Sequence, residues 1–172
     1  MGEVCGLRWT DADLAAGVLV VRQQAVQLGT TVSYGKPKTR SGEDRAVPLA
    51  GRVPSLLEAQ RRRQATERLA FGPDYTESGL VFTQPDGSPL LPASVSQAHT
   101  RLVRASGLPP CRFHDLRHLA ATTLLQAGVP MPLISRILGH SSIQITVDTY
   151  GHVTLDPAVH SLVDRALTSF VR

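Results

Sequence analysis

The sequence predicts a mainly helical α+β domain with a small three-stranded antiparallel sheet near its N-terminus. Three short segments read as strands: 18–22, which is β-branched, 31–34, and 45–49, which alternates. Apolar residues recur at helical spacing from residue 54 onward. The chain has 172 residues, of which 42% are hydrophobic. That length and composition suit one domain that buries a core without disulfides or a structural metal.

Turn-forming residues separate the predicted elements. Gly29 marks a turn before the second strand, and the polar, proline- and glycine-containing loop 36–44 precedes the third. We expect helices over residues 54–69, 93–105, 116–126, 133–138 and 142–150. In the first helix, Leu56, Leu57 and Leu69 should face inward, and helix 116–126 is apolar enough to lie centrally in the core.

The cysteines and the apolar runs exclude several classes of protein. Cys5 and Cys111 have no Cys-x-x-Cys partner, which argues against a disulfide framework or a structural zinc site and fits a reducing compartment. The longest apolar runs, such as 15–21, are too short to cross a bilayer, and no secretory leader opens the chain. We therefore expect a cytoplasmic protein that does not enter membranes.

The charge balance mildly favours a polyanionic partner. There are 18 Lys and Arg residues against 14 Asp and Glu, a net charge of +4. All the cationic residues except Lys36 and Lys38 are arginines, which a GC-rich genome also explains. A lysine with a chemical role therefore has only two candidate positions.

Polar residues suited to phosphate chemistry gather between residues 113 and 153. His114 and Arg117 share a helical face, His140 follows a Leu-Gly break, and Tyr150 lies near the end of the next helix. A guanidinium matches phosphate oxygens, a tyrosine hydroxyl can attack phosphorus, and imidazoles can hydrogen-bond the developing phosphorane. Because no acidic cluster adjoins these residues, the pattern favours a covalent phosphoryl transfer without metal or cofactor.

Each of these residues has a simpler interpretation. A single histidine on a helix is usually structural. His114 and His118 could form a zinc pair, but the third ligand and the glutamate of a metalloprotease helix are missing. Residues 128–150 also fit a loose helix-turn-helix pattern, which would bind DNA without cleaving it.

Residues 113–153 resemble the signature of the tyrosine recombinases, the phage integrase family. His-x-x-Arg, Leu-Gly-His and a tyrosine follow one another in the family's order, within FHDLRH, LGHSS and DTYGH. GEVCGLRWTDADL resembles the family's first box, and KPKTRSGEDRAVPL resembles its β-hairpin box. The resemblance covers essentially the whole chain. Type IB topoisomerases use the same kind of catalytic residues, but the spacing of those residues matches this sequence less well.

The resemblance implies the fold of DNA breaking-rejoining enzymes and a role for each matching residue. Tyr150 would attack the scissile phosphate of double-stranded DNA at a recombination site, forming a 3′-phosphotyrosyl link and releasing a 5′-hydroxyl. Arg117 would hold the phosphate. His114 would hydrogen-bond the phosphate or take the tyrosine proton, and His140 would contact a non-bridging oxygen.

The hairpin lysine of the family protonates the leaving 5′-oxygen, and the Lys-Thr-x-Ser context favours Lys38 over Lys36 for this role. Either lysine could instead be a solvated cation that touches the DNA backbone. Asp115 and His118 would lie beside His114 and hold its side chain in position.

The first box departs from the family pattern. Gly2 and Glu3 match it, but the arginine that completes the phosphate clamp would fall one residue before Met1, and Arg8 belongs to a later part of the box. We therefore expect residues 1–172 to be a catalytic domain that is incomplete at its N-terminus, lacks the core-binding domain, and is weakly active or inactive. The alternative is a non-catalytic DNA-binding or interaction module.

The C-terminal residues suggest a further partner. Asp156 and Pro157 begin a tail helix over residues 157–172 with an apolar stripe. The stripe either packs on the chain's own core or, as the resemblance implies, docks on a neighbouring protomer in the full-length protein.

Overall fold

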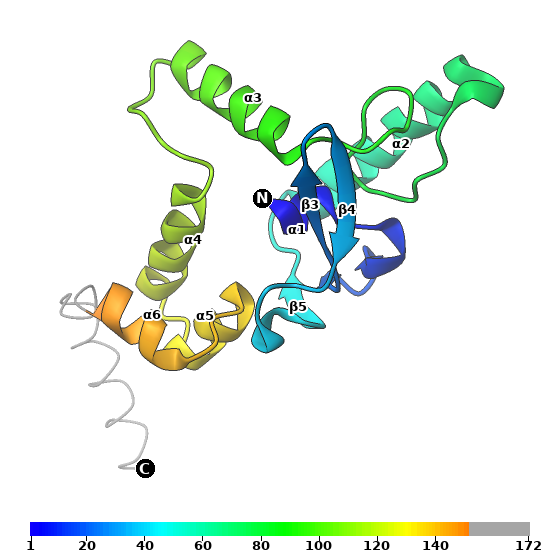
Figure 1. Cartoon of the computed structure of the whole chain (residues 1–172). Helices are drawn as coiled ribbons and strands as arrows, with labels where there is room; N and C mark the ends of the chain where they lie inside the picture. Colours follow the sequence, from blue (N-terminus) through cyan, green and yellow to red (C-terminus); the bar gives the residue numbers. More distant parts are fainter. Residues whose placement is uncertain (152–172) are drawn as a thin grey trace, which may run out of the picture.

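The computed structural model of the chain describes residues 1–151 (Figure 1). The predicted tail helix 157–172 lies outside the described residues. The chain opens with a short helix, α1, and a 3-10 turn. The N-terminal elements are α1 (Gly2–Cys5), η1 (Trp9–Asp11), β1 (Ala12–Asp13), β2 (Val18–Val21), β3 (Gln24–Leu28), β4 (Thr31–Gly35), η2 (Arg40–Gly42) and β5 (Arg45–Pro48).

The strands form two antiparallel sheets where the sequence predicted one. β1, β2 and β5 form a three-stranded sheet in the order β1-β2-β5, while β3 and β4 form a separate two-stranded sheet. The prediction that segment 31–34 joins the other two strands is therefore wrong. Leu28 pairs with Thr31 across a two-residue turn, in which Gly29 has a φ of 61°. This short loop closes at little entropic cost and favours local pairing with β3, which the sequence analysis missed.

All five predicted helices are present, and no end is shifted by more than two residues. They are α2 (Val53–Phe71), followed by η3 (Gly72–Asp74), α3 (Pro92–Ala105), α4 (Asp115–Gln126), α5 (Met131–Leu138) and α6 (Ile143–Tyr150). Prolines occupy the first turns of α2, α3 and α5, where the missing N–H costs no helical hydrogen bond. The predicted mainly helical fold class with small antiparallel sheets is confirmed.

Two separate clusters of buried side chains form the core of the described residues. The first joins Leu7, Leu57 and Val81, and the second joins residues of α4, α5 and α6: Ala121, Ile134, Leu138 and Tyr150. The second cluster places the side chain of Tyr150 inside the packed helices rather than on their surface. Tyr150, one of the catalytic candidates, is therefore part of the core formed by α4, α5 and α6.

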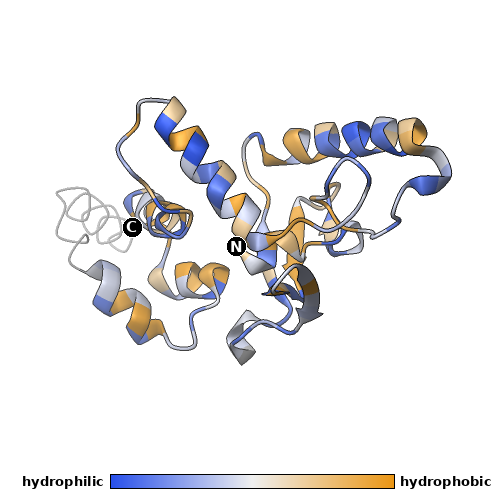
Figure 2. Ribbon diagram, turned by 45° about the horizontal axis from the view of Figure 1, so that its top comes forward, coloured by the Kyte–Doolittle hydropathy of each residue, from blue (hydrophilic) through white to orange (hydrophobic). Residues whose placement is uncertain are grey.

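Several residues predicted to be inside are not. Leu57 is buried, but Leu56 and Leu69 are 60% and 84% exposed, because α2 packs through one narrow face and the middle of the helix is hydrophilic (Figure 2). Helix α4 is also less central than expected: Ala121 is buried, whereas Leu119 is 63% exposed. Among the described elements, α4 packs mainly against α5, so one side of α4 remains uncovered.

The elements fall into two groups. Figure 1 shows α4, α5 and α6 together on one side, the strands with α1 and α2 on the other, and α3 between them above. Contacts between α5 and β5 join the two groups. Within residues 1–151, no helix combines the length and apolar character needed to cross a membrane.

Candidate active site

Tyr150 lies at the end of α6, with 5% of its surface exposed. Its hydroxyl oxygen is 2.7 Å from Nδ1 of His118 on α4, and the two rings are 5.9 Å apart. Burial raises the pKa of Tyr150, and the nearby positive charge of Arg117 only partly opposes this. The side chain is therefore a neutral phenol at neutral pH, and it needs a proton acceptor to become a nucleophile.

The first turn of α4 brings three functional candidates together. His114 is the N-cap residue of α4, and Arg117 donates its backbone N–H to the His114 carbonyl oxygen. The rings of His114 and His118 meet edge to face, with centroids 5.3 Å apart. Partial desolvation, followed by the charges of His118 and Arg117, lowers the pKa of His114. This predicts a neutral imidazole at His114 near neutral pH.

Arg117 is half-buried and lies among the other charged groups of the site. Burial and the neighbouring Arg45 lower the pKa of its guanidinium, whereas Glu3 and Tyr150 raise it. The guanidinium makes no hydrogen bond with another side chain in the part of the chain that the structure describes. The guanidinium interacts electrostatically with the Tyr150 hydroxyl, and its donors are available to bind an anion.

His140 is held by the turn between α5 and α6. Gly139 ends α5 in the left-handed conformation, with a φ of 72°, and His140 Nδ1 lies 2.8 Å from the Thr146 hydroxyl oxygen. Burial, then the charges of Arg117, His118 and Arg45, lower the pKa of His140. If Thr146 donates to Nδ1, the neutral ring carries its proton on Nε2, which can donate to a phosphate oxygen.

Arg45, which the sequence analysis missed, pairs with Glu3 within the N-terminal half and also reaches the helical half of the structure. Arg45 on β5 binds both carboxylate oxygens of Glu3 on α1, at 2.8 and 2.6 Å, and donates from Nε to the Ile137 carbonyl oxygen at 3.0 Å. A Cβ at residue 139 would lie only 2.8 Å from Arg45 Nη1, so Gly139 is required here for space as well as for conformation. Arg45 thus holds the turn that carries His140 against the sheet.

Removing this arginine should cost more stability than breaking a solvent-exposed pair. We expect Arg45→Met to lower the free energy of unfolding by about 1–3 kcal/mol, because the Glu3 carboxylate and the Ile137 carbonyl lose their donor. Lys36→Met is the matched control, since the Lys36–Glu43 pair is exposed and should contribute at most about 1 kcal/mol. Urea denaturation of both variants measures the difference. Equal losses would show that Arg45 does not join the two halves.

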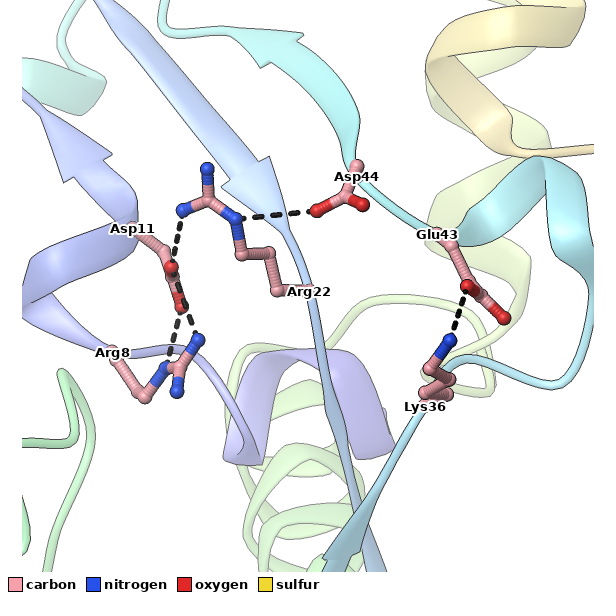
Figure 3. Close-up of polar contacts among 6 residues, drawn as sticks. All are labelled: Arg8, Asp11, Arg22, Lys36, Glu43 and Asp44. Carbon is pink, nitrogen blue, oxygen red and sulfur yellow. Dashed lines mark hydrogen bonds and ion pairs between the residues drawn. The ribbon is translucent and has the colours of Figure 1, made fainter.

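Ion pairs hold both ends of the loop 36–44, which contains Lys36 and Lys38 (Figure 3). Lys36 Nζ lies 3.0 Å from a Glu43 carboxylate oxygen, which closes the base of the loop. Arg22 binds Asp44 at 3.2 Å and the buried carboxylate of Asp11 at 2.7 Å. Arg8 also binds Asp11, at 2.7 Å. Lys36 is therefore engaged in shaping the loop.

Lys38 is exposed on this loop and makes no ion pair with any residue in the range 1–151. Its neighbour Thr39 donates a long hydrogen bond of 3.4 Å to the carbonyl oxygen of Gly139, the residue before His140. The loop therefore carries Lys38 to the same end of α5 as His140. Of the two lysines, Lys38 is the one whose amine is free to meet a substrate.

The structure brings most of the predicted residues together and corrects two. Tyr150 and Arg117 lie close to each other, and His114 and His140 lie close to Arg117. The expectation that Asp115 supports His114 is wrong, because its carboxylate binds the backbone N–H and the guanidinium of Arg112. Likewise His118 does more than support His114, since its ring nitrogen contacts Tyr150 directly.

The family model described as "Phage integrase family" matches residues 1–156. The chain belongs to the phage integrase family. It is 33% identical over 163 residues to a "Tyrosine recombinase XerC-like" protein of Caldanaerobacter subterraneus subsp. tengcongensis, which covers 88% of this chain and 42% of that protein. It is 29% identical over 154 residues to the "ICEBs1 integrase" of Bacillus subtilis (strain 168), covering 88% and 41%. This family member thus spans less than half the length of these relatives.

Solved structures agree with this assignment. The Tn1549 transposon integrase, in complex with circular intermediate DNA, superposes with a TM-score of 0.76 and 25% identity, over 95% of this chain and 55% of that one. XerA recombinase superposes with a TM-score of 0.66 at 23% identity, over 96% of this chain and 52% of that one, which supports the fold alone. The fold of this integrase-family chain is therefore that of the tyrosine recombinase catalytic domain.

Proposed function

We propose that this chain carries out, at a low rate, the strand cleavage and rejoining of site-specific DNA recombination, through a covalent 3′-phosphotyrosyl intermediate. The observation that carries the proposal is the geometry around Tyr150: its hydroxyl contacts an imidazole at 2.7 Å and lies within the field of the Arg117 guanidinium. A phenol with a base on one side and a cation on the other is suited to attack a phosphodiester. Membership of the phage integrase family and the likeness to DNA-bound integrases support the same reaction.

In the proposed cleavage step, the Tyr150 hydroxyl loses its proton to an imidazole of the site and its oxygen bonds to phosphorus as the bond from phosphorus to the 5′-oxygen breaks. Arg117 and Nε2 of His140 stabilise the negative charge on the non-bridging oxygens of the phosphorane, and His114 adds a further hydrogen bond. Lys38 gives a proton to the leaving 5′-oxygen, which departs as a hydroxyl. Because Tyr150 keeps the phosphate as an ester, a 5′-hydroxyl from another strand can reverse the step and rejoin the DNA.

The proposed partner is double-stranded DNA at a recombination site, and the proposed location is the cytoplasm, where such DNA is accessible. The net charge of +4 is small, so DNA binding by this chain should be salt-sensitive and close to the non-specific range of about 10⁻⁴–10⁻⁶ M at physiological salt. Other protomers are proposed as partners of the apolar stripe at residues 157–172.

A nicked-duplex assay tests the proposal. The substrate is a pool of duplexes with randomised sequence and a nick a few nucleotides to the 3′ side of the possible cleavage positions, so that the short released strand diffuses away and the adduct is trapped. A protein band that shifts on a denaturing gel with labelled DNA supports strand cleavage. DNA binding without any adduct, at all concentrations and incubation times, would instead support the non-catalytic DNA-binding module.

Substitution of the two lysines should separate their roles. Lys38→Ala should lower the cleavage rate strongly, while Lys36→Ala should change it little, because Lys36 is held by Glu43. A substrate with sulfur in place of the 5′-bridging oxygen should restore cleavage in Lys38→Ala, since a thiolate leaves without a proton. Loss of cleavage in Lys36→Ala that the sulfur substrate restores would exchange the two assignments.

A further inference from the structure

The contact between His118 and Tyr150 has a chemical consequence that the family signature does not include. Tyr150 is buried and its pKa is raised, so its proton must be removed as the oxygen attacks. Among the hydrogen bonds within residues 1–151, the one that the Tyr150 hydroxyl makes is to Nδ1 of His118, at 2.7 Å. That distance is within the range for direct proton transfer between a hydroxyl and a general base.

We propose that His118 is a catalytic residue, the general base that takes the phenolic proton of Tyr150 during cleavage and returns it during rejoining. The inference rests on the proposed function. It differs from the expectation that His114 serves this role: the His114 ring lies against the edge of His118, with 5.3 Å between centroids. In this arrangement His114 is the neighbour of the base and makes no contact with the Tyr150 hydroxyl among the hydrogen bonds of residues 1–151.

The proton balance is complete with Tyr150, His118 and Lys38. As the O–P bond forms, the Tyr150 proton moves to Nδ1 of His118, which becomes an imidazolium with its second proton on Nε2. The 5′-oxygen leaves with a proton from Lys38, so the site as a whole gains no charge. In rejoining, the neutral Lys38 amine takes the proton of the attacking 5′-hydroxyl as its oxygen bonds to phosphorus. The His118 imidazolium gives its Nδ1 proton back to the phenolate oxygen as the phosphotyrosyl ester breaks.

The surroundings of His118 suit this cycle. The residue is exposed as a whole, so Nε2 can exchange its proton with water, while Nδ1 is directed to the buried phenol. The titratable and charged groups near it are His114, Asp115 and Arg117 on or beside its own helix, and Tyr150 and His140 from the α5–α6 side.

The test uses a duplex whose sequence formed an adduct in the nicked-duplex assay. The rate of single-turnover cleavage of this duplex is measured between pH 5 and 9 for His118→Gln and for His114→Gln. Glutamine can still accept a hydrogen bond from Tyr150 but cannot carry its proton. We expect His118→Gln to cleave about 10²–10⁴-fold more slowly at neutral pH. Its rate should rise steadily with pH, without the inflection of the parent chain. His114→Gln should also be slower but should retain that inflection.

A substrate with sulfur at the 5′-bridging position adds a second readout. The defect of His118→Gln should persist on it, because the base acts on the nucleophile and not on the leaving group. Retention of the parent pH profile in His118→Gln, or full rescue by sulfur, would overturn the assignment of His118. Failure of the parent chain to form any adduct would instead contradict the proposed function, so the two failures are distinguishable.

Discussion

Tyr150→Phe should abolish the covalent adduct with DNA while leaving the fold and the DNA affinity nearly unchanged. Phenylalanine keeps the ring that packs against Ala121, Ile134 and Leu138, so the helical core retains its contacts. The variant loses one hydrogen bond, to His118, which changes the free energy of unfolding by only about 0.5–1.5 kcal/mol. No other atom at that position can attack phosphorus, so the loss of adduct should be complete on any substrate.

The chain supplies its own control for this experiment. It has 3 tyrosines, and Tyr75 lies in the segment after η3, away from α4 and α6. Tyr75→Phe should form the adduct at the parent rate in the nicked-duplex assay. An adduct that survives in Tyr150→Phe would assign the nucleophile to another residue.

Arg117→Ala should lower the rate of cleavage by about 10²–10³-fold, the usual cost of removing one preorganised donor from a developing oxyanion. The guanidinium is half-buried and interacts with the Tyr150 hydroxyl, and in the proposed step it also binds the phosphate, so water cannot replace its charge fully. Arg117→Lys should recover part of the rate, because a lysine restores the charge but not the planar pair of donors.

Single-turnover rates at saturating DNA separate this effect from weaker binding. Arg136→Ala is the matched control, because Arg136 is exposed on α5 and contributes its backbone carbonyl rather than its side chain to the turn at Gly139. The control should cleave at the parent rate. A loss in Arg117→Ala that is no greater than in Arg136→Ala would show that Arg117 serves general DNA attraction only.

Local features of the sequence predicted the helices well. Prolines at helix starts and glycines at helix ends fix backbone angles within a few residues, so the bounds of α2, α3 and α5 follow from composition. The same holds for the site: His114 and Arg117 are close because they are one helical turn apart. The proximity of these two side chains therefore follows from their spacing in the sequence alone.

Contacts between distant segments could not be predicted in this way. Glu3 and Arg45 are 42 residues apart, and His118 and Tyr150 are 32 apart, so only the packing of separate elements brings each pair together. The pairing of β3 with β4 was missed for a related reason. Segment 24–28 does not alternate and has one β-branched residue, so its strand signal was weaker than that of segment 31–34, which has two. The choice of partner depended on the Gly29 turn.

The central claim, that Tyr150 becomes covalently joined to DNA, is tested most directly by mass spectrometry of the trapped adduct. The parent chain is incubated with the nicked-duplex pool in the presence of EDTA, the adduct is digested with a protease and a nuclease, and the modified peptide is sequenced. We expect a nucleotide attached through its 3′-phosphate to Tyr150, in an amount that EDTA does not reduce. A nucleotide on any other residue, or an adduct that forms only when a divalent metal is restored, would contradict the account.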